Sequence, residues 1–196
     1  MVLWIFGYGS LIWKAGFHYE DRIVGYIKGY RRVFYQGSTD HRGTPENPGR
    51  TVTLLPQEGA KCWGTAYRVC GPDAEQKLVL SYLDLREKEY DVRESVDFFT
   101  VESTKPAISN VLVYIGSPNR INNKYYLGPA PLFDMASQIA TAIGPAGPNY
   151  EYLFRLEEAL LKIGHADEEI IELANEVRKF SMIPKGILTR RGEAAG

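Results

Sequence analysis

The hydrophobic pattern changes period about two thirds of the way along the chain, and this change limits the possible folds most. Residues 2–115 carry short apolar runs of β-branched, aromatic or alternating character, whereas from Leu132 apolar residues recur at the helical spacing. Strands followed by helices predict an α+β fold. We see no repeat or linker, so we expect residues 1–180 to form a single domain and 181–196 a disordered tail.

In the first part, a strand over residues 2–7 is expected to enter a tight glycine turn. Residues 37–50 are turn formers without a hydrophobic period, so we expect a long loop there and consider it the first candidate for a mobile lid. Further strands are expected at residues 23–34, as one or two strands with an irregular join, at 51–55 and 61–69, as a pair, and at 92–101 and 110–115.

Four helices are expected. The helix over residues 73–88 has an acidic first turn and a stripe of Leu78, Tyr82 and Leu85, with Val79 and Leu83 beside it. The others have apolar stripes over residues 132–143, 153–163 and 170–177, with Asn149 and Asp167 as the N-caps of the last two.

Composition excludes several function classes. Lys and Arg total 23 against 24 Asp and Glu, so the chain lacks the basic excess of a nucleic-acid or membrane-surface binder. Its longest apolar run is far shorter than a membrane span and carries no secretory signal, which predicts a cytoplasmic protein. Cys62 and Cys70 do not form a disulfide framework, and the three histidines lack metal-ligand spacing, so we expect no metal site.

The turn after the first strand, Gly7-Tyr8-Gly9-Ser10, is a candidate binding element. A dinucleotide fingerprint would need a third glycine where Ile12 stands, and no P-loop Gly-Lys follows, so nucleotide binding is excluded. Because glycine carries no side chain, backbone N–H groups here can approach a carboxylate or amide oxygen. Spacing alone slightly favours an ordinary tight turn at the end of a strand over a binding element.

Five sequence blocks follow one another along the chain: FGYGSLIW at 6–13, QGSTDHRG at 36–43, PGRTVTL at 48–54, YLDLRE at 82–87 and YYLGPAPL at 125–132. In this order they closely resemble the glutathione-specific γ-glutamylcyclotransferases of the ChaC-like family. The resemblance extends over residues 3–179. It implies a mixed β-barrel flanked by helices and a cofactor-free cleavage of glutathione into 5-oxoproline and cysteinylglycine.

Such a reaction needs no enzyme nucleophile, because the α-amine of the substrate attacks its own γ-carbonyl. It does need a group that takes a proton from the amine and returns it to the departing nitrogen. Glu87 matches the catalytic glutamate of the family, and we assign it this role. Its place near a helix C-terminus, with partial burial, is expected to raise its pKa. A surface glutamate paired with Arg86 or Lys88 is the alternative, and Glu89 is a possible partner in the site.

The resemblance also assigns the substrate-binding segment, in which backbone amides hold the γ-glutamyl end. We extend this to an oxyanion-stabilising role for the amides. Arg50 is considered either a bidentate ligand of a glutathione carboxylate or a solvated arginine, and Tyr126, rather than Tyr125, is favoured as a substrate ligand. Arg31 and Arg32 are expected to be solvated. The substrate-binding segment that the resemblance assigns consists of Ile5, Phe6, Gly7, Tyr8, Gly9 and Ser10, and Leu11 completes it.

The sequence therefore predicts a monomeric lyase acting on glutathione. Two alternatives stay open. One is a cyclotransferase acting on other γ-glutamyl compounds, and the other is a non-catalytic module of the same fold that binds a γ-glutamyl ligand or a protein.

Overall fold

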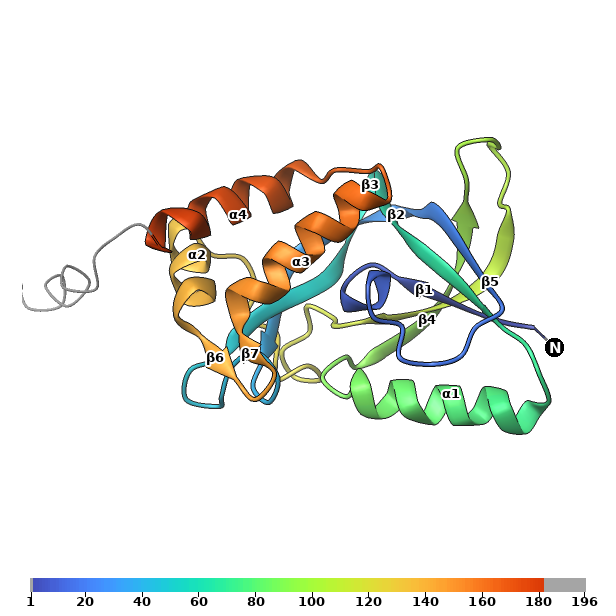
Figure 1. Ribbon diagram of the computed structural model, residues 1–196, viewed down its shortest axis with the longest axis horizontal. Helices are drawn as coiled ribbons and strands as arrows, with labels where there is room; N and C mark the ends of the chain where they lie inside the picture. Colours follow the sequence, from blue (N-terminus) through green and yellow to red (C-terminus); the bar gives the residue numbers. More distant parts are fainter. Residues whose placement is uncertain (1, 182–196) are drawn as a thin grey trace, which may run out of the picture.

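The computed structural model describes residues 2–181, and its centre is a closed barrel of five strands (Figure 1). The strands are β1 (Leu3–Gly7), β2 (Asp21–Ser38), β3 (Gly49–Val69), β4 (Val92–Phe99) and β5 (Ile108–Ile115). Around the barrel the order is β1-β3-β2-β4-β5. β1 and β5 are parallel, whereas the other pairs are antiparallel, so the predicted mixed barrel is confirmed.

The long hairpin of β2 and β3 corrects one expectation. Residues 51–55 and 61–69 do not pair with each other, because both belong to β3 and both pair with β2. The register shifts where Lys28 faces Lys61 and Tyr30 faces Pro56. At this bulge Gly29 has a φ of 82° and the extra residues opposite it include Gly59 with a φ of 77°, a conformation that glycine adopts without strain. This is the irregular join expected in residues 23–34.

Helices cover the barrel on two sides (Figure 1). α1 (Asp73–Arg86) connects β3 to β4, while α2 (Leu132–Thr141), α3 (Asn149–Lys162) and α4 (Glu168–Ser181) form a layer on the other side. A 3₁₀ turn, η1 (Ser10–Ile12), follows β1, and a two-stranded ribbon of β6 (Ile143–Gly144) and β7 (Gly147–Pro148) joins α2 to α3. The helix expected to reach residue 143 therefore ends two residues earlier.

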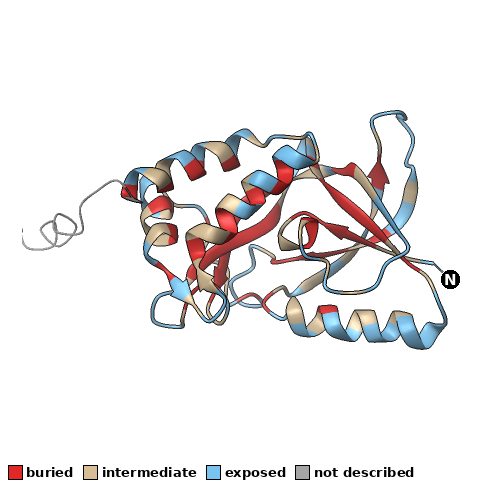
Figure 2. Ribbon diagram, viewed as in Figure 1, coloured by how far each residue is buried: buried red, intermediate tan, exposed pale blue. Residues whose placement is uncertain are grey.

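The main core lies between the barrel and the α2–α4 layer, and a smaller cluster lies under α1 (Figure 2). The expected inward stripe of α1 is wrong. Leu78 and Leu85 are 71% and 75% exposed, whereas Leu83 is buried and Val79 packs beside it. One narrow face of α1 is enough to cover the smaller cluster, so the remaining leucines face solvent.

The expected N-caps differ in outcome. Asp167 accepts a hydrogen bond from the Ile170 N–H at 3.4 Å, as a cap of α4 should. Asn149 is not a cap, because its side-chain amide exchanges two hydrogen bonds with the backbone of Arg50, at 2.7 and 2.8 Å, and so fixes the start of α3 to β3. The tail expected at 181–196 lies outside the described residues, apart from residue 181 at the end of α4. Within residues 2–181 no helix is long and apolar enough to cross a membrane.

Candidate active site

A pocket lies where the end of β1, the turn η1, the end of α1 and α3 meet, and we call it the inner pocket. Five of the seven residues predicted for the binding segment line it. Ile5 does not, because it is fully buried in the cluster under α1, and Gly7 lies in the barrel opposite Thr65. The lining residues are Phe6, Tyr8, Gly9, Ser10, Leu11, Val52, Glu87, Tyr90, Tyr114 and Tyr152.

Gly9 shapes the floor of the inner pocket because a side chain would not fit there. A Cβ at this position would lie 2.8 Å from Val52 Cγ2 and 2.9 Å from the Tyr152 hydroxyl. The first hydrogen bond of the turn runs from Ile12 N–H to the Gly9 carbonyl at 3.0 Å. N–H groups before the first such bond have no partner within the helix and are available to a ligand. This geometry suits the oxygen of a carbonyl or carboxylate.

Arg32 supports the same turn and corrects the expectation that it is solvated. It is 4% exposed, and its Nε donates to the Tyr8 carbonyl at 2.7 Å. Its Nη1 donates to Asp167 at 2.7 Å, and Nη2 donates to the Trp63 carbonyl. One buried guanidinium thus joins the end of β1 to β3 and to the start of α4. Arg31, in contrast, forms an exposed ion pair with Glu169.

Glu87 is the first residue after α1, and its backbone N–H still donates to Leu83 O at 2.7 Å. Its side chain is only 13% exposed and faces the aromatic inner pocket. This burial raises the pKa of Glu87 to about 7, against the opposing effect of the Arg86 charge and with a smaller contribution from Glu89. A carboxyl group with this pKa can both accept and donate a proton near neutral pH.

Arg86 is a site residue that sequence reasoning missed. Its Nε lies 3.4 Å from Glu87 Oε1, its Nη2 donates to Ser10 Oγ at 2.8 Å, and its Nη1 donates to the Ala15 carbonyl at 2.7 Å. The side chain therefore joins the carboxyl group to the η1 turn. In the sequence it resembles any solvated arginine in the last turn of a helix.

Four tyrosines surround Glu87, and only Tyr8 was predicted. The Tyr8 hydroxyl donates to the Tyr114 carbonyl, and the Tyr90 hydroxyl donates to the Val52 carbonyl, both at 2.7 Å. Burial raises the pKa of Tyr8, Tyr90 and Tyr152 above the ordinary value, so these phenols stay neutral. Tyr90, Tyr114 and Tyr152 lie far apart in the sequence, and no spacing pattern connects them before folding.

A second, larger space of about 560 Å³ adjoins the inner pocket, and we call it the outer cleft. The two share Ser10, Glu87, Tyr90 and Tyr152. About half of the other residues that line the outer cleft are charged, and the loop after β2 borders it. Its charged and imidazole side chains other than Glu87 are Lys14, Asp40, His41, Arg42, Arg86, Lys88, Glu89 and Arg155.

Glu89 lines the outer cleft and not the inner pocket. Its carboxylate accepts hydrogen bonds from the N–H and hydroxyl of Thr39, at 3.2 and 3.1 Å, and so holds the start of the loop after β2. Burial raises the pKa of Glu89, while the Thr39 hydrogen bonds oppose this change. Its contacts indicate a role in positioning the loop.

Arg50 and Tyr126, two predicted ligands, are not brought to either space. Arg50 is 5% exposed and donates to Gln138 at 2.6 Å and to the carbonyls of Phe34 and Gly128 at 2.9 Å. These protein acceptors use its guanidinium, so it is neither a carboxylate ligand nor solvated. The Tyr126 ring packs edge-on against Tyr35, and Tyr125 is no core residue, being only partly buried.

The family model described as "ChaC-like protein" matches residues 3–180. Gamma-glutamylcyclotransferase 2-1 of Arabidopsis thaliana is 54% identical over 188 residues, which cover 95% of this chain and 87% of the relative. The human glutathione-specific gamma-glutamylcyclotransferase 1 is 41% identical over 180 residues, covering 89% and 78%. A yeast γ-glutamyl cyclotransferase specific to glutathione has a crystal structure that superposes with a TM-score of 0.78 at 31% identity, covering 92% and 99% of the two chains. With its barrel, its Glu87 pocket and these matches across most of its length, the chain belongs to the ChaC-like family.

Proposed function

We propose that this protein cleaves glutathione into 5-oxoproline and cysteinylglycine, with Glu87 as the proton carrier. The observation that supports this most strongly is a nearly buried carboxyl group with a pKa of about 7 in a pocket floored by the Gly9 turn. Relatives named as glutathione-specific γ-glutamylcyclotransferases, at 34–47% identity, support the choice of substrate.

In the proposed reaction, N–H groups of the η1 turn bind the γ-glutamyl group and polarise its γ-carbonyl oxygen. Ionised Glu87 takes a proton from the α-ammonium of the substrate, and the freed amine attacks the γ-carbonyl carbon. A new C–N bond closes the five-membered ring. Glu87 then gives its proton to the amide nitrogen as the old C–N bond breaks, which releases the amine of cysteinylglycine. The ring nitrogen loses its second proton, and the released amine takes up a proton to become an ammonium. Two protons thus pass from the α-nitrogen of the substrate to the leaving nitrogen, and no water is consumed.

Burial of Glu87 serves both halves of this cycle. A carboxylate of ordinary pKa is a very weak base toward an ammonium, and at neutral pH it does not hold a proton. The raised pKa makes the Glu87 carboxylate a stronger base and lets it keep the proton until the amide nitrogen departs. The surrounding tyrosines remain neutral, so they add dipoles to the inner pocket without adding charge.

A cyclotransferase for other γ-glutamyl compounds is the second candidate. The outer cleft favours glutathione, because its volume of about 560 Å³ can take the Cys-Gly half, whereas a γ-glutamyl dipeptide or amine would leave more of it unfilled. The test is to incubate the protein separately with reduced glutathione and with γ-glutamylalanine, and to follow 5-oxoproline and the released amine by mass spectrometry. We expect equal amounts of 5-oxoproline and cysteinylglycine from glutathione alone. Turnover of γ-glutamylalanine at a similar rate would favour the second candidate.

Failure to turn over either substrate would contradict both enzymatic proposals. Thermal stabilisation by glutathione without any product would then favour a non-catalytic module that binds a γ-glutamyl ligand.

A further inference from the structure

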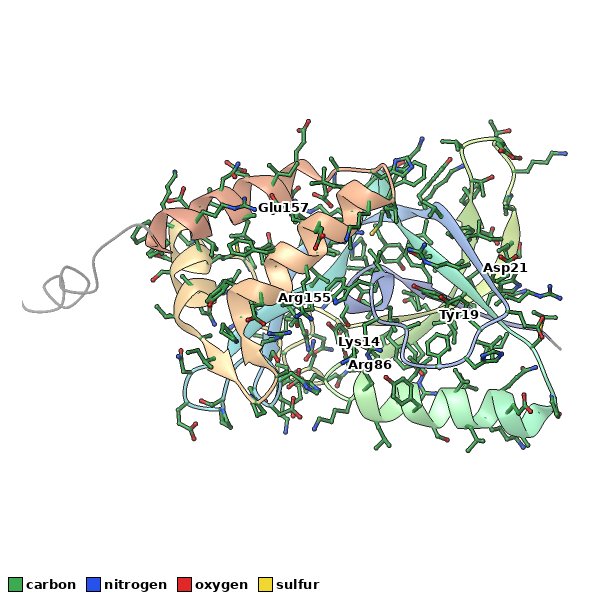
Figure 3. All side chains as sticks on the ribbon, in the orientation of Figure 1. Lys14, Tyr19, Asp21, Arg86, Arg155 and Glu157 are labelled. Carbon is green, nitrogen blue, oxygen red and sulfur yellow. The ribbon has the colours of Figure 1, made fainter. Side chains whose placement is uncertain are left out.

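The cations of the outer cleft differ in whether the protein itself pairs them. Arg42 contacts Glu151 and the Pro148 carbonyl, Lys88 pairs with Asp40, and Arg86 is held by Ser10 and Ala15. Lys14 and Arg155 also line the outer cleft (Figure 3). Within residues 2–181 neither side chain donates a hydrogen bond or forms an ion pair with a protein group. Glu158, three residues further along α3, pairs with Lys162 at 2.7 Å; Lys162 and, to a smaller extent, the charge of Arg155 lower the pKa of Glu158.

Both unpaired cations lie one turn beyond a residue of the inner pocket. The Lys14 N–H donates to the Ser10 carbonyl at 2.9 Å, so Lys14, two residues after the end of η1, still belongs to this turn of the chain. Arg155 is three residues after Tyr152 on α3, which places the two side chains on one face of that helix. Lys14 and Arg155 thus approach the outer cleft from two different elements, and Figure 3 shows them between α3 and α1.

We propose that Lys14 and Arg155 bind the C-terminal carboxylate of glutathione and so select it over shorter γ-glutamyl compounds. The inference rests on the proposed function. With the γ-glutamyl group in the inner pocket, the scissile amide lies at Glu87 and the Cys-Gly half extends into the outer cleft. The Cys-Gly half, as two extended residues, spans about 7 Å. Lys14 and Arg155 each lie one turn from a residue of the inner pocket, and side chains one turn apart are separated by about 5–6 Å. The two lengths are similar, so the C-terminal carboxylate can reach the two cations.

The negative charge of the ligand is opposite to the charge of the two cations. Glutathione bears a carboxylate at its glycine end, whereas a γ-glutamylamine bears none. An ion pair that an exposed lysine and an arginine form with the ligand strengthens binding without touching the reacting atoms. It therefore lowers KM and leaves kcat little changed.

The test compares glutathione with its glycine carboxamide, which lacks only the C-terminal charge. For the unmodified protein we expect kcat/KM to be about tenfold higher on glutathione, mainly through KM. In the double variant Lys14→Met/Arg155→Met this ratio should fall to about one. The matched control Arg31→Met/Lys105→Met removes two positive charges elsewhere and should keep the ratio. Added salt should raise KM for glutathione more than for the amide.

A double variant that keeps the preference of the unmodified protein would overturn the inference. Equal losses on both substrates would also overturn it, because they would indicate a structural role. If the unmodified protein turns over glutathione and its amide equally well, this inference fails while the proposed function stands. If it turns over neither substrate, the proposed function itself fails.

Discussion

The inner pocket and the outer cleft meet at Glu87 but are built in different ways. Inner-pocket tyrosines, such as Tyr8 and Tyr90, donate to backbone carbonyls of the barrel, and its one carboxyl group is 13% exposed. The outer cleft is lined largely by loops, by the end of α1 and by α3, is rich in charge and includes two exposed, unpaired cations. The inner-pocket tyrosines are held by protein partners and stay neutral, so they keep a fixed geometry around Glu87, which suits proton transfer. The solvated cations of the outer cleft are free to bind a ligand, which suits substrate selection.

Replacement of Glu87 should have the largest effect. Glu87→Gln keeps the size of the side chain but can carry no proton, so we expect kcat on glutathione to fall about 10³-fold, with an equal loss on the amide. Steady-state kinetics measure this, and the exposed Glu158→Gln is the control. For the unmodified protein, kcat/KM should rise with pH through an inflection near 7. Activity of Glu87→Gln within tenfold of the unmodified protein would refute the assignment.

Replacement of Gly9 should have the second largest effect, because Gly9 belongs to the inner pocket and not to the outer cleft. In Gly9→Ala the new methyl group meets Val52 and the Tyr152 hydroxyl, which displaces the N–H groups of the turn, and we expect kcat to fall about 100-fold. Gly59→Ala is the matched control. It strains a φ of 77° in open space far along β3 and should lower stability while keeping kcat. Equal kcat values in the two variants would show that the turn takes no part in catalysis.

The buried carboxyl group should also affect stability. The pKa of Glu87 is about 7 in the folded protein and near 4.5 when unfolded, so the folded state binds more protons between these pH values. Stability is therefore lost as pH rises from 4.5 to 7. At pH 8 Glu87→Gln should be more stable than the unmodified protein by on the order of 3 kcal/mol, and at pH 4 the two should be equal. Urea unfolding measures both values, and a variant less stable at pH 8 would contradict the burial effect.

Replacement of Arg86 should have the smallest of these effects on activity. It distinguishes an effect on the pKa of Glu87 from an effect on the η1 turn. Arg86→Met removes the charge that lowers the pKa of Glu87 and the hydrogen bond to Ser10, so we expect about a tenfold loss of kcat/KM on both substrates. The inflection of the pH profile should move above 7. A loss without any such movement would mean that Arg86 acts through the turn alone.

The sequence predicted those parts of the fold that depend on local pattern. Strands, helix positions and the Asp167 cap follow from periodicity and residue type. The pairing of β3 with β2 along its whole length did not, because short apolar runs do not reveal their partner. The exposed face of α1 was also missed, since propensity does not tell which leucines the barrel will cover.

Within the site, local motifs indicated Glu87 and the Gly9 turn, and the structure brings them together. Arg50 and Arg32 were misjudged because an arginine in a loop or strand has the same sequence signature whether it is solvated or buried on carbonyl groups. Tyr90, Tyr114 and Tyr152 come from three different elements. Only the closed barrel and the packing of α3 bring them to one pocket.

The most direct test of the account is to carry out the reaction with glutathione in water enriched in oxygen-18. The mass of the product that carries the γ-glutamyl carbon atoms is then measured by mass spectrometry. Attack by the α-amine consumes no water, so the account predicts 5-oxoproline without the heavy isotope. Glutamate carrying one oxygen-18 atom would show that water attacks the γ-carbonyl, and it would contradict the proposed role of the inner pocket.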